Sequence, residues 1–157
     1  MRTMKQLAML VLGVTVVGGA LADAQGDFLP GCDPKDEKTS CQVPGDFVQT
    51  PQLDKFKVTC SARTEICVDL QDTGPFFDDT MEVEVKCVSP TSRTFGAVTP
   101  KGGDAGVCVS DCAKAKVFIR CANEPRKKKP PCHDTYSALF DCDWADIGVE
   151  QTGNGNE

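Results

Sequence analysis

Three short segments of the chain share an alternating pattern of apolar and polar residues that ends in a cysteine. The segments are residues 56–60, 83–87 and 117–121. In each, two apolar side chains and the cysteine occupy alternate positions, and the positions between them are mostly charged or polar. Because successive side chains of a strand point to opposite faces of a sheet, this spacing predicts half-buried strands. We therefore expect Cys60, Cys87 and Cys121 to be buried between two sheets.

Two further segments alternate with the cysteine in the opposite phase. In residues 65–70 and 106–110 the apolar side chains again occupy alternate positions, but Cys67 and Cys108 fall on the polar side. Because these two cysteines share an unusual phase, we expect them to pair with each other.

The pattern as a whole predicts strands over residues 55–62, 65–70, 81–89, 106–110 and 116–122. Tight turns are expected at Arg63-Thr64 and at residues 111–114. Longer connections are expected at residues 71–80 and 90–106, where turn-forming residues accumulate. Without helical crossovers the strands would be antiparallel. The expected fold class is all-β: a small disulfide-stapled antiparallel sandwich of about five strands, with an irregular N-terminal arm and a bridged C-terminal appendage.

The remaining stretches predict the organisation around this sandwich. Residues 25–51 are rich in Pro, Gly, Asp and Thr, which indicates an irregular arm held down by Cys32 and Cys41, with a bridge between the two as one possibility. Residues 124–131 predict an extended, proline-flanked basic linker, and residues 137–140 a helical turn. A single cysteine-rich β domain would span residues 25–149, followed by a disordered tail over residues 150–157.

The first 24 residues predict a cleaved signal peptide. Arg2 and Lys5 precede an apolar run over residues 7–17, and Ala22-Asp23-Ala24 supplies the small residues that signal peptidase requires. Residues 20–22 offer a second site. The alternative, a transmembrane anchor, is disfavoured because the apolar run is too short to cross about 30 Å of hydrocarbon. We therefore expect a secreted, extracellular protein with no membrane span.

Ten cysteines lie beyond the signal peptide, which predicts a disulfide framework. A zinc site is an alternative, but the chain has no C-x-x-C motif and His133 is its only histidine. With all thiols paired, none could serve as a nucleophile. No cofactor is expected. The expected disulfide residues are Cys32, Cys41, Cys60, Cys67, Cys87, Cys108, Cys112, Cys121, Cys132 and Cys142.

The charge balance limits the partners. The chain carries 17 Lys and Arg against 23 Asp and Glu. Removing residues 1–24 leaves 15 against 22, a net charge of −7. A phosphate backbone would repel such a protein, so no nucleic-acid partner is expected. The expected partner is an extracellular protein or glycan.

One segment resembles a known catalytic motif. Residues 132–136 read Cys-His-Asp-Thr-Tyr, which is similar to the H-D-x-C-Y helix of secreted phospholipases A2. The resemblance implies that His133 activates water and that Asp134 binds calcium. Counted from His133, Thr135 takes the variable position and Tyr136 stands where the motif has cysteine; the glycine-rich calcium loop is also missing. The alternative is a surface histidine.

Three other groups are candidates for binding. Asp141, Asp143 and Asp146 surround Trp144 and offer oxygen ligands for calcium, although the register of an EF-hand loop is absent; the alternative is a solvated acidic turn. Phe76 and Phe77 are either an exposed apolar tip or a cap on the core. The basic run is a docking patch for anionic glycans or lipid head groups, a processing site or a solvated linker; its residues are Arg126, Lys127, Lys128 and Lys129.

These features favour a secreted, non-enzymatic binding protein that acts through its loops, like an effector or a toxin. No G-x-S-x-G, H-E-x-x-H or catalytic Cys-His signature is present. The alternatives are a small secreted hydrolase of the phospholipase or glycosidase type, and a protease inhibitor. A signal peptide followed by a compact cysteine-rich body is similar to the effectors that plant-associated fungi and oomycetes secrete, which would imply a role in virulence.

Overall fold

The computed structural model describes residues 27–47, 52–74, 79–100, 102–122, 132 and 135–154. The predicted signal peptide lies outside these residues. They form seven antiparallel strands and one short 3₁₀ helix, and no helix among them is long and apolar enough to cross a membrane. The all-β prediction is confirmed, with seven strands in place of five. The elements are η1 (Pro34–Asp36), β1 (Ser40–Asp46), β2 (Leu53–Asp72), β3 (Met81–Ser89), β4 (Arg93–Val98), β5 (Asp104–Cys121), β6 (Thr135–Asp141) and β7 (Ile147–Asn154).

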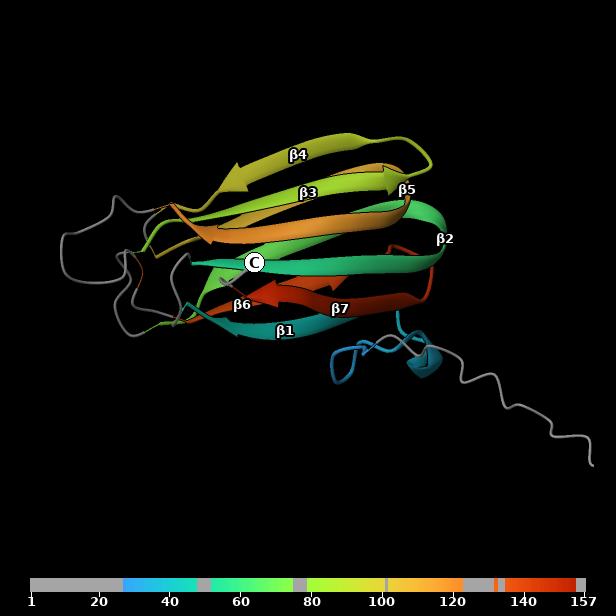
Figure 1. The fold of residues 1–157 in the computed structure, drawn as a ribbon, viewed down its shortest axis with the longest axis horizontal. Helices are drawn as coiled ribbons and strands as arrows, with labels where there is room; N and C mark the ends of the chain where they lie inside the picture. Colours follow the sequence, from blue (N-terminus) through green and yellow to red (C-terminus); the bar gives the residue numbers. More distant parts are fainter. Residues whose placement is uncertain are drawn as a thin grey trace, which may run out of the picture.

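Strands β2 and β5 are the longest elements and organise the fold. They contain 20 and 18 residues and pair with each other from Leu53, opposite Arg120, to Gln71, opposite Asp104. Figure 1 shows that both strands fold over near their midpoints. The pairing register shifts at this point in β2, and Asp111 of β5 has a positive φ of 60°. Such irregularities let strands turn a corner between packed sheets.

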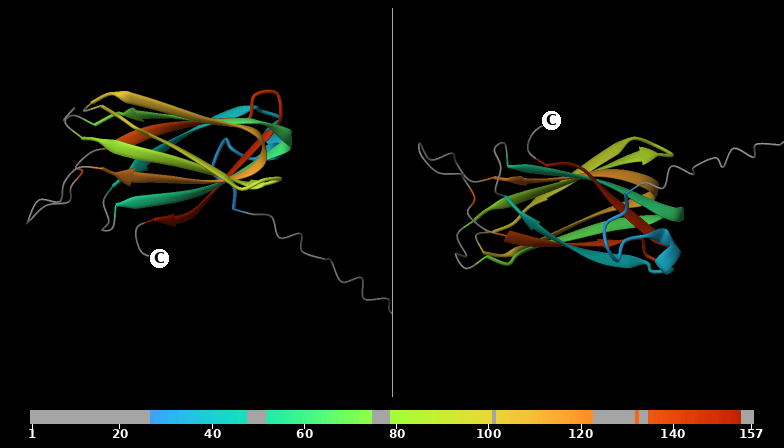
Figure 2. Two further views of the ribbon diagram at one scale, coloured as in Figure 1. Left: turned by 90° about the horizontal axis from the view of Figure 1, so that it is seen from above. Right: turned by 60° about the horizontal axis from the view of Figure 1, so that its bottom comes forward.

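The fold-over places the two halves of each long strand in two facing layers (Figure 2). The first half of β2 pairs with β7, and the second half pairs with β6. One layer therefore contains β4, β3, the second half of β5, the first half of β2, and β7. The other contains the first half of β5, the second half of β2, β6 and β1. One continuous sheet forms both sides of a sandwich.

Side chains from both layers meet in a common core. The even-numbered residues of β2 point inward on both sides of the fold-over, so Phe56 and Val68 are both buried. The rings of Phe56 and Phe140 lie 5.3 Å apart across the layers. The disulfide between Cys60 and Cys142 joins the layers near the fold-over. The apolar positions of β2 that the alternation predicts to face the core are thus confirmed.

The predicted turns at Arg63-Thr64 and at residues 111–114 are wrong. β2 and β5 continue through both positions as strands. The residues expected to form turns lie at the fold-over, where β2 and β5 each pass from one layer to the other while remaining hydrogen-bonded in the sheet. Strand β3, in contrast, has the bounds predicted from its alternation.

Other predicted irregular segments are also strands. The connection expected over residues 90–106 contains β4 and the start of β5. The helical turn expected at residues 137–140 is part of β6, whose inward residues Tyr136, Ala138 and Phe140 follow a period of two. This strand pairs with β1 and β2, so the C-terminal segment is part of the sandwich and not an appendage. Residues 150–154, expected in a disordered tail, belong to β7.

The N-terminal arm is partly irregular. Residues 27–39 contain η1 and lie along β7, where Phe28 forms a bridge with Glu150. The backbone N–H of Leu29 donates to Val149 O at 2.8 Å. The arm then enters β1, an element that the sequence did not predict.

All ten cysteines are paired. The predicted bridge between Cys67 and Cys108 is confirmed, and Cys32 pairs with Cys41. Cys60 and Cys87 are buried as predicted, but Cys121 is only partly buried because it ends β5. The remaining bridges are Cys60–Cys142, Cys87–Cys112 and Cys121–Cys132.

Candidate functional site

A groove of about 360 Å³ crosses the outward face of the layer that contains β1 and β6. It follows from the alternation of the strands, because the residues between the buried positions point away from the core. The groove extends across four adjacent strands. Its lining residues are Gln42, Asp69, Leu70, Gln71, Asp104, Ala105, Gly106, Ser137 and Leu139.

The register of the strands explains the shape of the groove. Asp69 lies between Leu139 on β6 and Gly106 on β5. Gly106 has no side chain, and the carboxylate of Asp69 occupies the space that a Cβ atom there would need. Two residue pairs further along, Gln71 lies between Ser137 and Asp104. The missing side chain at position 106 therefore makes room for the Asp69 carboxylate, which lines the groove together with Asp104.

Some polar side chains of the groove are hydrogen-bonded to each other, and others have no partner among the described residues and can bind a ligand. Gln42 Nε2 donates a hydrogen bond to Ser137 Oγ at 2.6 Å, which fixes both side chains at one wall. Asp69 and Asp104 are exposed and form no ion pair with any described residue. Leu139 is 38% exposed and adds an apolar surface beside Asp69.

The whole outward face of this layer is acidic. Its outward residues include five carboxylates and, apart from Arg63 at the fold-over, which is paired with Asp111, no Lys or Arg within the described part of the chain. We call this surface the acidic face; its carboxylates are Asp46, Glu65, Asp69, Asp104 and Asp141. Carboxylates without cationic partners create a negative potential that attracts a cation. An apolar side chain next to them suits a ligand with an alkyl stem and a charged head, which are the parts of lysine and arginine.

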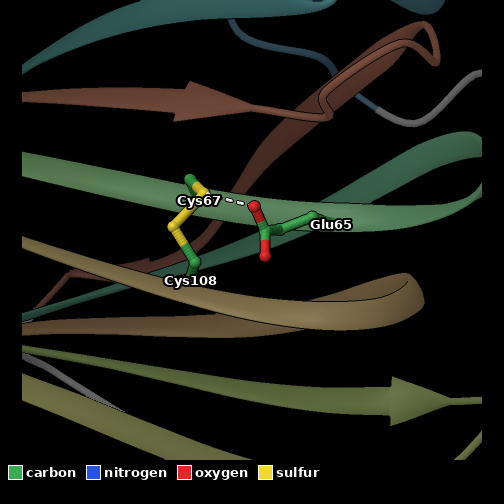
Figure 3. A group of neighbouring side chains, drawn as sticks. All are labelled: Glu65, Cys67 and Cys108. Carbon is green, nitrogen blue, oxygen red and sulfur yellow. Dashed lines mark hydrogen bonds between the residues drawn. A yellow bond between two sulfur atoms is a disulfide. The ribbon is translucent and has the colours of Figure 1, made fainter.

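A disulfide lies on the same face, beside a carboxylate (Figure 3). Cys67 Sγ is 3.8 Å from Glu65 Oε1, and Cys108 completes a group of three potential ligand atoms within 4.8 Å of one another. Both sulfur atoms belong to the disulfide, so neither is a thiolate that could bind a metal. Cys67 also has no thiol hydrogen, so the approach to Glu65 is a contact without a hydrogen bond. In its oxidised form this group acts as a cross-link.

A buried polar cluster lies at the end of the sandwich where β2 begins and ends. Tyr136 Oη donates to Asp54 Oδ2 at 2.5 Å, and both residues are buried. Burial raises the pKa of the Asp54 carboxyl; the Tyr136 hydrogen bond opposes this rise and the nearby charge of Asp46 adds to it. Burial and the neighbouring charge of Asp54 raise the pKa of Tyr136 as well. Neither residue lines the groove, so this pair connects the two layers.

The side chain of Gln52 forms hydrogen bonds with backbone groups near this cluster. Its Nε2 donates to Phe47 O at 2.6 Å and to Cys132 O at 2.8 Å, and its Oε1 accepts from Cys132 N at 2.9 Å. Cys132 is therefore fixed by Gln52 and by its bond to Cys121.

Most of the sequence-predicted site residues lie outside the described residues. These are Phe76, Phe77, His133, Asp134 and the basic run at residues 126–129. The described residues that flank them lie at the end of the sandwich that holds the buried cluster: Ala122 N donates to Thr80 O, and Thr73 N donates to Thr135 O. The proposed loop functions remain predictions.

The three predicted calcium ligands, Asp141, Asp143 and Asp146, are among the described residues, but their carboxylates do not lie close together. Asp141 ends β6 on the acidic face, opposite Cys67. Asp143 has a positive φ of 42° in the following turn, and the backbone N–H of Asp146 donates a hydrogen bond to Ser61 Oγ at 2.9 Å. Within the described residues, these three carboxylates do not form a group of potential ligand atoms.

Sequence reasoning missed the groove. Asp69, Gln71 and Asp104 were visible as polar positions, but no motif connects them. Only the pairing of β2 with β5 and β6 brings them together. No protein-family model matches the chain, and no curated protein matches it in sequence.

Proposed function

We propose that this chain is a secreted, non-enzymatic binding protein, and that its acidic face binds lysine or arginine side chains of an extracellular partner protein. The groove carries this proposal: it places unpaired Asp69 and Asp104 beside exposed Leu139 on a rigid sheet. The five disulfides are typical of proteins that leave the cell. An effector-like or toxin-like role fits such a scaffold.

The dimensions of the groove favour a side chain over a larger ligand. Its volume of about 360 Å³ is at the lower end of small-molecule pockets. The alkyl stem of a lysine or arginine would lie on Leu139. Its cationic head would then reach the carboxylates of Asp69 and Asp104, and Gln71 between them can accept a further hydrogen bond.

The lining offers binding groups and no nucleophile paired with a histidine or lysine base. It contains Ser137, but this hydroxyl already accepts a hydrogen bond from Gln42 and has no histidine or lysine base in the lining. A nucleophile needs such a base within hydrogen-bond distance. The groove therefore supports binding better than acyl or phosphoryl transfer.

The test is a titration of the oxidised protein with an N-acetylated tetralysine peptide, compared with the same peptide acetylated on every side chain. Acetylation removes the charge and keeps the alkyl stem. Binding of the charged peptide alone is expected. Asp69→Asn and Asp104→Asn should each weaken it about tenfold, since a charge-assisted hydrogen bond contributes roughly 1.5–3 kcal/mol.

Two further variants distinguish binding in the groove from non-specific attraction of the peptide to the net negative charge of the protein. Asp36→Asn makes the same charge change in η1, away from the groove, and should leave the affinity unchanged. Gly106→Ala changes no charge but displaces the Asp69 carboxylate, and should weaken binding. Equal losses in Asp36→Asn and Asp69→Asn, or equal binding of the acetylated peptide, would contradict the proposal.

A further inference from the structure

The outward face of the other layer carries a row of lysines from three adjacent strands. Lys116 of β5 lies opposite Lys57 of β2 on one side and opposite Lys86 of β3 on the other. Lys114 points outward two residues before Lys116, and all four side chains are exposed. We call Lys57, Lys86, Lys114 and Lys116 the lysine row.

This arrangement opposes the stability of the sheet. Like charges directly opposite each other on neighbouring strands are destabilising. Lys57 is partly compensated, because its Nζ lies 3.0 Å from Glu150 Oε2. Within the part of the chain that the structure describes, Lys86, Lys114 and Lys116 have no ion pair. Three uncompensated cations therefore lie close together.

The carboxylates of β3 do not neutralise the lysine row. Glu82 and Glu84 lie toward Arg120, at 4.0 Å and 3.6 Å from its nitrogen atoms. Counted over β2, β3, β5 and β7, the outward side chains of this layer comprise six cations and three carboxylates. The cations are Lys55, Lys57, Lys86, Lys114, Lys116 and Arg120.

The two outward faces of the sandwich thus have opposite charge. The acidic face has five carboxylates and, beside Arg63 at the fold-over, no described cation, whereas this face has an excess of cations. The chain as a whole has a net charge of −6. The lysine row is therefore a local feature that the overall composition conceals.

We propose that the lysine row binds a linear sulfated polysaccharide. Neighbouring strands lie about 4.8 Å apart, so the ammonium groups of three adjacent strands repeat along a line perpendicular to the strands. A linear polymer that follows this line meets one cation at each strand. Each ammonium group can donate three hydrogen bonds to sulfate oxygens.

The net charge of −6 repels a nucleic acid and a sulfated polysaccharide alike, so these two polyanions are separated by the oligonucleotide arm of the test below. A membrane surface is disfavoured by the side chains of this face. A membrane-binding surface needs apolar side chains to insert beside its cations. Val88 on β3 (41% exposed) and Val98 on β4 (56% exposed, opposite Glu82) are the exposed large apolar residues in the outward phase of these two strands, and neither is the Trp, Phe or Leu that such surfaces insert.

The experiment measures the affinity of the full oxidised protein for a heparin-derived decasaccharide at several salt concentrations. The double variant Lys86→Gln/Lys116→Gln should bind at least tenfold more weakly. Its slope of log Kd against log salt should fall by about 1.5 to 2, since each lysine releases roughly one counterion. The matched control is Lys35→Gln/Lys38→Gln, which removes two exposed lysines near η1 and should bind like the wild type.

Three results would overturn the inference. In the first, the control loses as much affinity as the Lys86/Lys116 variant. In the second, replacing Arg126, Lys127, Lys128 and Lys129 with glutamine abolishes binding while the Lys86/Lys116 variant retains it. In the third, an oligonucleotide or phosphatidylserine vesicles of equal charge bind as tightly through the same lysines. Peptide binding by the groove is independent of all three results, so the two proposals can fail separately.

Discussion

The hydroxyl of Tyr136 and the carboxylate of Asp54 form a hydrogen bond inside the sandwich, at 2.5 Å. Tyr136 is the second residue of β6 in one layer, and Asp54 is the second residue of β2 in the other. The two ends of β2 therefore meet through one side-chain contact, because Tyr136 is also paired on the backbone with Asp72. The contact can form only because β2 folds over, and the hydrogen bond in turn holds the two ends of β2 together.

Replacing Tyr136 with phenylalanine tests the contact. The change removes one oxygen and leaves Asp54 buried without its donor, so the free energy of unfolding should fall by about 1–3 kcal/mol. Urea denaturation of the oxidised protein measures this difference. In a cycle with Asp54→Asn, the two changes should not be additive. Additive changes would show that the residues do not interact.

The titration of Asp54 predicts a dependence of stability on pH. Burial raises the pKa of its carboxyl in the folded state, so the folded protein holds the proton more tightly than the unfolded chain. This contribution to stability is complete below the unfolded pKa and is lost as the pH rises through the folded pKa. The free energy of unfolding of the wild type, relative to Asp54→Asn, should therefore fall between pH 3 and pH 7. A difference that rises over this range would contradict the assignment.

The disulfides should differ in their effect on stability according to the loops they close. Cys60 and Cys142 are separated by 82 residues, whereas Cys32 and Cys41 are separated by 9. The chain-entropy model assigns about 4.5 kcal/mol to the long loop and about 2.6 kcal/mol to the short one. All four cysteines are buried, so alanine pairs leave comparable cavities. Urea denaturation should show the larger loss for Cys60→Ala/Cys142→Ala; an equal or smaller loss would contradict the model.

The lysine row should reduce stability. Lys116→Gln removes the cation that lies opposite both Lys57 and Lys86, and should raise the free energy of unfolding by about 0.2–1 kcal/mol at low salt. The gain should disappear in 1 M salt, where exposed charges are screened. Lys35→Gln serves as the matched control and should show no gain. A loss of stability in Lys116→Gln at low salt would mean that its charge is favourable in the free protein.

The sequence predicted the features that depend on local alternation. Strand β3 and the inward phase of Phe56 and Val68 follow from a period of two. The shared phase of Cys67 and Cys108 predicted their bond correctly. These features need no knowledge of which strands are neighbours.

The features that depend on strand pairing could not be predicted in the same way. Near Arg63 the apolar alternation is interrupted at Thr64, as it would be at a hairpin turn. The strand nevertheless continues, and its two halves lie in different layers, one beside β7 and the other beside β6. The groove at Asp69 and the lysine row around Lys116 exist only because of one register. A shift by one residue would move every side chain of a strand to the opposite face.

The groove is the central claim, and an NMR titration of the ¹⁵N-labelled oxidised protein with the charged tetralysine peptide tests it most directly. The amide signals of the groove should shift with one saturation curve, and those of the lysine row should not move. The expected groove signals are Gln42, Asp69, Gln71, Asp104, Gly106, Ser137 and Leu139. Shifts confined to residues 75–78 or 123–134, or scattered over all carboxylates of the chain, would contradict binding in the groove.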